Sequence, residues 1–160
     1  MALSFKNRFK YNLYIWYFGL AKVRLINFCR PQIVDVNKKE VILSIPLNRR
    51  TRNHVGSMYI GVMTVGVDLV AGLTAMLKIR ESKKNVILIF KDMTSNFLKR
   101  AEGDVHFICK IREKIAEAVD ETIESGERVN LLVPVVAIVP DKFGDEPVAE
   151  FTITLSLKEK

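Results

Sequence analysis

The least polar stretch of the chain reads Val55-Gly56-Ser57-Met58-Tyr59-Ile60-Gly61-Val62-Met63-Thr64-Val65-Gly66-Val67-Asp68-Leu69-Val70-Ala71-Gly72-Leu73-Thr74-Ala75-Met76-Leu77. Its only ionisable side chains are Tyr59 and Asp68. The stretch lacks period-two alternation, and its length indicates a helix rather than a strand. A helix that is apolar all round is either a membrane span or a buried core helix. Asp68 near the middle, the three glycines Gly61, Gly66 and Gly72 and the flanking strand patterns favour the core helix.

Strand patterns lie on both sides of this helix. The other regular segments follow in this order: a hairpin at 32–47, strand-like stretches at 86–98 and 104–109, an acidic amphipathic helix at 112–125 closed by Gly126, and strand-like stretches at 129–139 and 148–157. One apolar helix against one antiparallel sheet makes a two-layer α+β domain. Because the helix is apolar on every side, the sheet must curl round it or a second subunit must complete its burial.

The N-terminal segment carries much of the basic character of the chain. The whole chain contains 25 Lys and Arg residues against 18 Asp and Glu residues. Residues 1–34 contain six of these bases and no acid. Apolar residues at steps of three and four predict one helix over 4–29, and they are Phe5, Phe9, Tyr14, Trp16, Tyr17, Leu20, Val23 and Ile26. We expect 1–31 to form an amphipathic helix docked on a domain at 32–160. The alternative is a helix lying on a membrane surface, because basic helices with Trp and Phe suit the headgroup region.

Length and composition bound the remaining possibilities. With 160 residues, 49 % of them apolar, the chain is expected to form one globular domain. Cys29 and Cys109 are far apart, so we expect no disulfide framework and no metal site. The uncharged run 11–21 is too short for a bilayer span, which needs about 20 residues. We therefore expect a cytoplasmic protein, with attachment to the inner membrane surface as the alternative, and no nucleic-acid partner, because no binding module is recognisable.

Asp68 and the start of the apolar helix carry the candidate chemistry. A carboxylate in apolar surroundings loses hydration unless it is paired or protonated, and no base lies within a turn of Asp68 on this helix. Asp68 is therefore a candidate general base or nucleophile, and the alternative is a structural Asp that caps a backbone segment. Free N–H groups around Tyr59 to Gly61 suit a developing oxyanion. This arrangement fits attack on a thioester or ester carbonyl.

Asn53, Gly56, Ser57, Gly61 and Asp68 together resemble the central-helix motif of hotdog-fold acyl-CoA thioesterases of the phenylacetic-acid-degradation type. That motif contains Asn, Gly-Ser or Gly-Thr, His-Gly-Gly and a later acid, and Asn53 and Asp68 have its spacing of fifteen residues. The stretch 97–104 resembles the strand-turn segment of the family. The segment 53–57 and the N-terminal helix resemble an uncharacterised branch of hotdog proteins more closely still.

The resemblance implies a long helix wrapped by an antiparallel sheet, and two subunits that pair their sheets edge to edge. The partners are then a second copy, as a homodimer or a dimer of dimers, and an acyl-CoA or other acyl thioester. The sites lie between subunits, with CoA as part of the substrate and no separate cofactor. Asp68 is the base or nucleophile, the Ile60 amide polarises the carbonyl and Asn53 places the reacting groups. Ser57, Tyr59 and Gly61 complete the substrate-binding set.

The sequence departs from the motif at two positions. Tyr59 stands where the family has His, and Ile60 stands where it has the first Gly of the pair. Glycine permits a positive φ, whereas a β-branched residue with positive φ is an outlier. The turn must therefore differ, or the pocket is narrower. The alternative function is a non-catalytic protein that binds acyl-CoA or acyl groups.

Basic residues after the helix supply a second set of candidates. Their side chains would meet the phosphates of CoA or form a solvated loop, and they are Lys78, Arg80, Lys83 and Lys84. His54 and His106 have no ligand-like spacing. We expect a loop position for His54, a strand position for His106 and no catalytic role for either.

Overall fold

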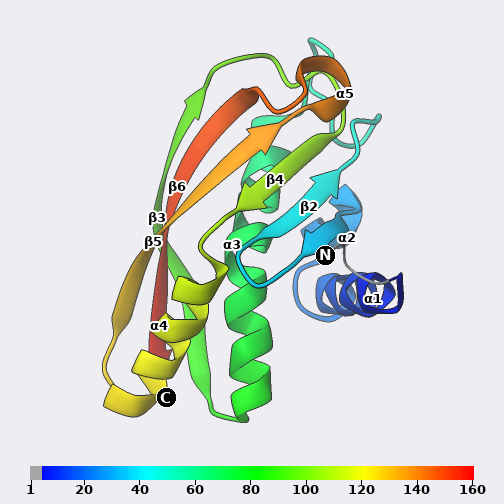
Figure 1. The fold of residues 1–160 in the computed structure, drawn as a ribbon. Helices are drawn as coiled ribbons and strands as arrows, with labels where there is room; N and C mark the ends of the chain where they lie inside the picture. The colour runs from blue at the N-terminus through cyan, green and yellow to red at the C-terminus, as the bar shows by residue number, and fades with distance from the viewer. Residues whose placement is uncertain (1–4) are drawn as a thin grey trace.

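The computed structural model describes residues 5–160, which form a six-stranded antiparallel sheet curled round one long helix (Figure 1). The strands lie in the order β1-β2-β4-β5-β6-β3. The elements are α1 (Phe5–Ala21), α2 (Arg24–Cys29), β1 (Gln32–Val36), β2 (Val41–Ile45), α3 (Ile60–Ser82), β3 (Val86–Phe97), β4 (Val105–Cys109), α4 (Arg112–Ser125), β5 (Val129–Ile138), α5 (Pro140–Phe143) and β6 (Pro147–Glu159). This is the α+β hotdog architecture, and the expected fold is confirmed.

The long helix α3 is the core of the domain. By length and composition it would also pass as a membrane span, but most of it is buried within the protein. At Gly66 the helix touches β4: a Cβ built there would lie 2.3 Å from a ring carbon of the fully buried Phe107. The core-helix interpretation is therefore correct, and Gly66 is required because the Phe107 ring occupies the space of a side chain.

The bounds of α3 differ from the predicted range 55–77. Residues 53–57 form a loop closed by the Asn53 side chain, so the helix begins at Ile60. At the other end the helix continues to Ser82, and Lys83 stops it in a left-handed conformation with φ 56°. Both differences lie at the ends of the segment, where apolar composition does not predict the residue at which a helix begins or ends.

The last strand, β6, pairs with β5 on one side and β3 on the other. The alternating residues Phe151, Ile153, Leu155 and Leu157 are buried on one face, and Thr154 and Ser156 on the opposite face are buried as well. The Thr154 hydroxyl donates to Asp92 Oδ1 at 2.6 Å, and Arg128 Nη1 donates to Ser156 Oγ at 2.9 Å. Hydrogen bonds to Asp92 and from Arg128 therefore satisfy the polar side chains on this face.

The single helix predicted over 4–29 is a pair of helices, with the chain turning at Lys22 and Val23; residue 4 lies outside the described residues. At this turn α2 packs against α1, and a Cβ at Gly19 would lie 2.6 Å from Asn27 Oδ1. Helical periodicity could not detect the break, because residues on both sides of it keep steps of three and four.

The face of the N-terminal segment that contacts the domain also differs from the expected one. Ile15 and Ile26 are buried, while Arg8 Nε donates to the Ile33 carbonyl at 2.8 Å and Asn12 Oδ1 accepts from the Ile33 amide at 2.7 Å. Most of the apolar residues expected to face the domain are instead exposed, namely Phe9, Trp16, Tyr17, Leu20 and Val23. Because aromatic residues surround α1, periodicity alone could not identify its inner face.

Candidate active site

A cavity of about 350 Å³ lies at the N-terminus of α3. Four of the predicted site residues line it: Asn53, Ser57, Tyr59 and Ile60. The opposite wall comes from the end of β3 and the turn that follows it, through Phe97, Lys99, Arg100 and Ala101. The tertiary structure therefore brings the two motif-like segments, 53–57 and 97–104, to one cavity.

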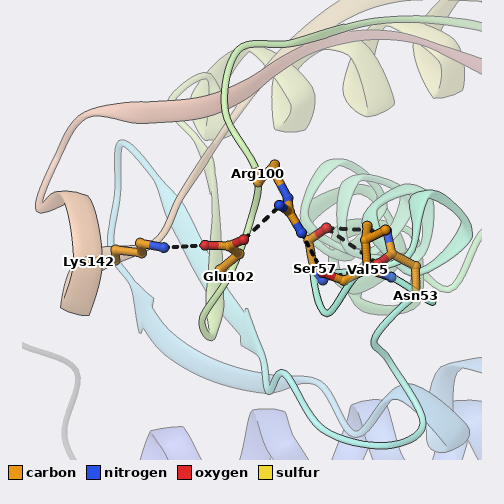
Figure 2. Close-up of polar contacts among 6 residues, drawn as sticks. All are labelled: Asn53, Val55, Ser57, Arg100, Glu102 and Lys142. Atoms are coloured by element: carbon orange, nitrogen blue, oxygen red, sulfur yellow. Dashed lines mark hydrogen bonds and ion pairs between the residues drawn. The ribbon is translucent and has the colours of Figure 1, made fainter.

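Asn53 shapes the loop that forms one side of this cavity. Its side-chain carbonyl accepts the amide of Val55 at 3.0 Å and the amide of Ser57 at 3.1 Å (Figure 2). The Asn53 amide also donates to the Ser57 carbonyl at 2.7 Å, and Gly56 provides a positive φ of 83°. Asn53 thus positions the loop, and direct contact between Asn53 and substrate stays a prediction.

A chain of ionic contacts holds the same loop from outside. Figure 2 shows Lys142 paired with Glu102, Glu102 paired with Arg100, and Arg100 donating to the Val55 carbonyl. The Lys142 ammonium beside Glu102, with a smaller effect from Arg100, lowers the pKa of the Glu102 carboxyl. Sequence analysis could not predict this link, because its members come from three separate segments of the chain.

Two backbone amides at the start of α3 are available as donors. Contrary to our expectation, the Tyr59 amide is not free, because it donates to the Thr51 carbonyl at 2.8 Å. Within residues 5–160, neither the Ile60 amide nor the Gly61 amide donates to a turn or cap acceptor. Both belong to the N-terminus of a long helix, where the dipole favours negative charge.

The turn at Tyr59 and Ile60 is an ordinary helix entry. Tyr59 has φ −69° and ψ 139°, and Ile60 is the first helical residue. The only described non-glycine residues with positive φ are Arg30 and Lys83. The Tyr59 ring lies over Gly61, where an added Cβ would be 2.8 Å from ring carbon Cε1. Of the two alternatives, a different turn or a narrower pocket, the structure adopts the different turn, and it does so without backbone strain.

Asp68 lies two turns further along α3, outside the cavity of its own chain. Eight residues separate it from Ile60, a rise of about 12 Å along the helix. Burial raises the pKa of the Asp68 carboxyl to about 6, and no hydrogen bond or ion pair in the described chain reaches this carboxylate. A Cβ at Gly72 would lie 4.0 Å from Asp68 Oδ1 and 3.4 Å from the Phe90 ring, so the carboxylate is beside β3.

A family model described as a domain of unknown function, DUF4442, matches residues 20–157. The chain belongs to the DUF4442 family. The matched range contains every element from α2 to β5 and most of β6, and it contains all the candidate site residues. Most of α1 precedes the match. No curated protein matches the sequence.

Solved structures share the fold of this DUF4442 chain along nearly its whole length. A Pseudomonas aeruginosa protein of unknown function, named a probable thioesterase, is 21 % identical with a TM-score of 0.72, and the match covers 100 % of this chain and 99 % of that one. A Chlorobaculum tepidum protein of unknown function is 14 % identical with a TM-score of 0.79 and coverage of 96 % and 97 %. Zebrafish thioesterase superfamily member 2 is 12 % identical with a TM-score of 0.65 and coverage of 93 % and 96 %. At these identities the similarity establishes the hotdog-type fold.

The basic candidates of the DUF4442 chain do not lie at this cavity. Lys78 pairs with Asp120 at 2.9 Å, and the Arg80 guanidinium lies over the Tyr14 ring at 5.5 Å. Lys83 caps α3, and Lys84 pairs with Glu159 at 3.6 Å. Their role toward CoA phosphates stays a prediction.

The remaining candidates are the histidines and the side chains that could bind a metal ion. His54 is an exposed loop residue, as expected, but it also lines the cavity. His106 lies in β4, where burial lowers its pKa. In the part of the chain that the structure describes, no three His, Cys, Asp or Glu side chains are grouped to hold a metal ion. Cys29 and Cys109 are buried and form no disulfide.

Proposed function

We propose that this DUF4442 protein hydrolyses acyl thioesters, with acyl-CoA as the substrate class, and that Asp68 acts without a metal ion. The observation that carries the proposal is the unpaired, half-buried carboxylate of Asp68 on the helix whose first residue, Ile60, lines a cavity. Strongly perturbed carboxylates beside clefts are frequent catalytic groups. The thioesterase names of several structural neighbours agree with this reaction class.

The proposed reaction uses two parts of α3. Above its pKa of about 6 the Asp68 carboxylate is ionised, and it takes a proton from water as the water oxygen adds to the thioester carbonyl. The Ile60 and Gly61 amides stabilise the oxyanion that forms. The C–S bond then breaks, and the leaving thiolate takes up the proton. In the alternative route Asp68 attacks the carbonyl itself and the C–S bond breaks to release the thiolate; water then hydrolyses the resulting anhydride and regenerates the Asp68 carboxylate.

The Asp68 carboxylate and the amides at the start of α3 form one site only if a second copy of the chain contributes one of them. In one chain Asp68 does not line the cavity at the helix start, but both adjoin β3: Phe97 lines the cavity, and Phe90 lies near Asp68. The free edge of β3 has no partner strand among the described residues. If β3 of a second copy paired antiparallel with this edge, Phe90 of that copy would lie toward the Phe97 end of the first. We therefore propose a homodimer with shared sites.

The dimer is a testable consequence of this arrangement. An unpaired edge strand of twelve residues with exposed Ile87 and Ile89 is a pairing surface. We expect twice the mass of one chain by light scattering at micromolar concentration, and we expect Ile89→Asp to give the monomer. The matched control is Leu132→Asp on β5, an exposed position away from the edge, which should remain dimeric. A monomeric wild type would contradict both the assembly and the shared site.

The activity test is a panel of acyl-CoA thioesters with release of free thiol as the readout. Turnover by the wild-type dimer, lost in the Ile89→Asp monomer, is the expected result. Tight binding of acyl-CoA without turnover would favour the alternative, a protein that binds acyl groups and has lost hydrolysis through Tyr59 and Ile60. Neither binding nor turnover across short, long and aromatic acyl groups would refute the proposal.

A second candidate function is attachment to an anionic membrane surface through α1 and α2. The apolar residues exposed on these helices are Phe9, Leu13, Trp16, Tyr17, Leu20, Leu25 and Phe28. Exposed bases accompany them at Lys6, Lys10, Lys22, Arg24 and Arg30, and the segment 5–34 contains no acid. Exposed aromatic side chains of this kind insert at the headgroup boundary, and the bases beside them pair with anionic lipid.

Liposome flotation tests this attachment. We expect the protein to float with vesicles containing phosphatidylglycerol and to remain behind with pure phosphatidylcholine. The double variant Phe9→Ser/Trp16→Ser should lose flotation, because both side chains are exposed and contribute little to the fold. Leu132→Ser, at an exposed apolar position on β5, is the control that should float normally. Equal flotation of the double variant and the wild type would refute attachment through α1.

A further inference from the structure

A second cavity, of about 620 Å³, lies between α1, the β1–β2 turn, the C-terminal half of α3 and the start of α4. Lys78, one of its lining residues, comes eighteen residues after Ile60, so the two cavities are about 27 Å apart along the helix. The second cavity has the size of a small-molecule site. It lies away from Asp68 and the free amides, and no step of the proposed hydrolysis uses it, although Lys78 and Arg80, the candidates for CoA phosphates, line it.

The walls of this cavity are mainly apolar and aromatic. Tyr11 and Tyr14 of α1 and Leu77 of α3 line it and are half-buried, while Leu13 and Tyr17 line it and are exposed. Two aromatic rings and an aliphatic side chain offer an apolar body a large contact area. An apolar body alone, however, would leave the polar atoms inside without partners.

Two buried polar atoms, on residues that line the cavity, lack hydrogen-bond partners. Thr74 is only 5 % exposed, and its hydroxyl has no partner. The Nε atom of Arg112 is buried without a partner, although its Nη1 donates to the Asn37 carbonyl. Buried polar groups in proteins are almost always hydrogen-bonded, because an unmade bond destabilises the fold. A hydroxyl and a guanidinium N–H that share one cavity would together suit an anionic oxygen.

The charges around the cavity favour an anion as well. Five bases line it, namely Lys10, Lys38, Lys78, Arg80 and Arg112, against two acids, Glu81 and Glu113. Lys78 already pairs with Asp120 on α4, and Arg80 lies over the Tyr14 ring. Lys10 and Lys38 are exposed, and no ion pair in residues 5–160 involves either of them. The excess of positive charge would attract an anion to the mouth of the cavity.

We propose that this cavity is a second binding site, for an amphipathic anion with a carboxylate or phosphate head and an apolar body. The head accepts hydrogen bonds from the Thr74 hydroxyl and from Nε of Arg112. The body lies against Tyr11, Tyr14 and Leu77. The proposal does not depend on thioester hydrolysis, because its test measures binding alone.

Isothermal titration of the full chain tests the proposal with three ten-carbon probes that differ only in the head group. We expect decanoate or decyl phosphate, or both, to bind, and the difference between them identifies the preferred head. Decanol has the same chain and a neutral head, and we expect it to bind at least about tenfold more weakly, since hydrogen bonds to charged groups are the stronger ones. Equal binding of decanol, or no binding of either anion, would overturn the proposal.

Thr74→Val is the decisive variant. It keeps the shape of the side chain and removes only the unpartnered hydroxyl, so the melting temperature should hold or rise. Affinity for the anionic probe should fall about tenfold. Ala116→Leu, which fills the cavity from α4, should weaken binding further.

Ile60→Ala at the other cavity is the matched control and should bind the probe normally. Unchanged affinity in Thr74→Val, or an equal loss in Ile60→Ala, would refute the assignment. Loss of thioester hydrolysis would leave these binding results unchanged, so the two proposals fail separately.

Discussion

Asp68→Asn is expected to lower acyl-CoA hydrolysis by at least about a hundredfold, the usual minimum for loss of a general base. The amide keeps the shape of the carboxyl group but neither accepts a proton from water nor attacks the thioester. Binding of substrate should change little, because the Ile60 and Gly61 amides remain in place. The measurement is release of free thiol at pH 7.5, expressed per folded molecule. Asp120→Asn on α4 makes the same chemical change far from the site and should keep full activity.

The same variant has an opposite effect on stability. Because the native pKa of Asp68, about 6, lies above its unfolded value near 3.8, folding takes up a proton between these pH values. Native stability therefore falls as the pH rises from about 4 to about 6, by no more than about 3 kcal/mol. Asp68→Asn abolishes this dependence, and its melting temperature at pH 7.5 should equal or exceed that of the wild type.

A variant that melts several degrees lower yet keeps near-normal turnover would contradict the catalytic assignment. That result would identify Asp68 as a cap or partner of a backbone segment, the structural alternative.

The activity of the wild type should rise with an apparent pKa near 6, because only the ionised carboxylate is active. A flat profile between pH 5 and pH 7 would equally count against it.

Gly66→Ala is expected to destabilise the protein by about 2–3 kcal/mol, since overpacking a rigid core usually has an effect of this size. The added Cβ would lie 2.3 Å from the ring of Phe107, whose side chain is fully buried on β4 and has little room to move. This loss exceeds the roughly 1 kcal/mol that alanine contributes over glycine in a helix. Thermal and urea unfolding measure the difference.

Gly72→Ala is the matched control, since the substitution and the helix are the same. Its Cβ would lie 3.4 Å from the nearest atom, on the Phe90 ring, which is an ordinary contact distance. We expect Gly72→Ala to be neutral or stabilising by up to about 1 kcal/mol. Adding Phe107→Leu to Gly66→Ala should restore part of the lost stability, because it clears the space that the Cβ needs. Equal stabilities for the two alanine variants would contradict the packing account.

Local sequence pattern was sufficient for the elements that bury one regular face. The helix predicted over 112–125 has these bounds in the structure, with Gly126 in a left-handed conformation at its end. The hairpin at 32–47 and the strand at 86–98 also lie where alternation and turn residues placed them. In each case the signal comes from residues two to four positions apart, and burial of that face rewards the same spacing.

The candidate site was only partly predictable. Asn53, Ser57, Tyr59 and Ile60 share a cavity, as the motif led us to expect, because they are close in the sequence. Arg100, Glu102 and Lys142 were missed, because each is an ordinary surface charge until the fold brings it to the loop. The resemblance of 97–104 to a family segment was the one signal that indicated this wall.

The sequence by itself indicated that one long apolar helix packs against an antiparallel sheet, since so continuous an apolar surface must be removed from water. Tertiary structure decided where that helix begins, through the Asn53 loop, and where the N-terminal segment turns, through the contact of Asn27 with Gly19. It also decided which side of α1 is buried and created the cavity round Thr74. These features depend on contacts between segments far apart in the chain, and the spacing of apolar residues along one segment carries no record of them.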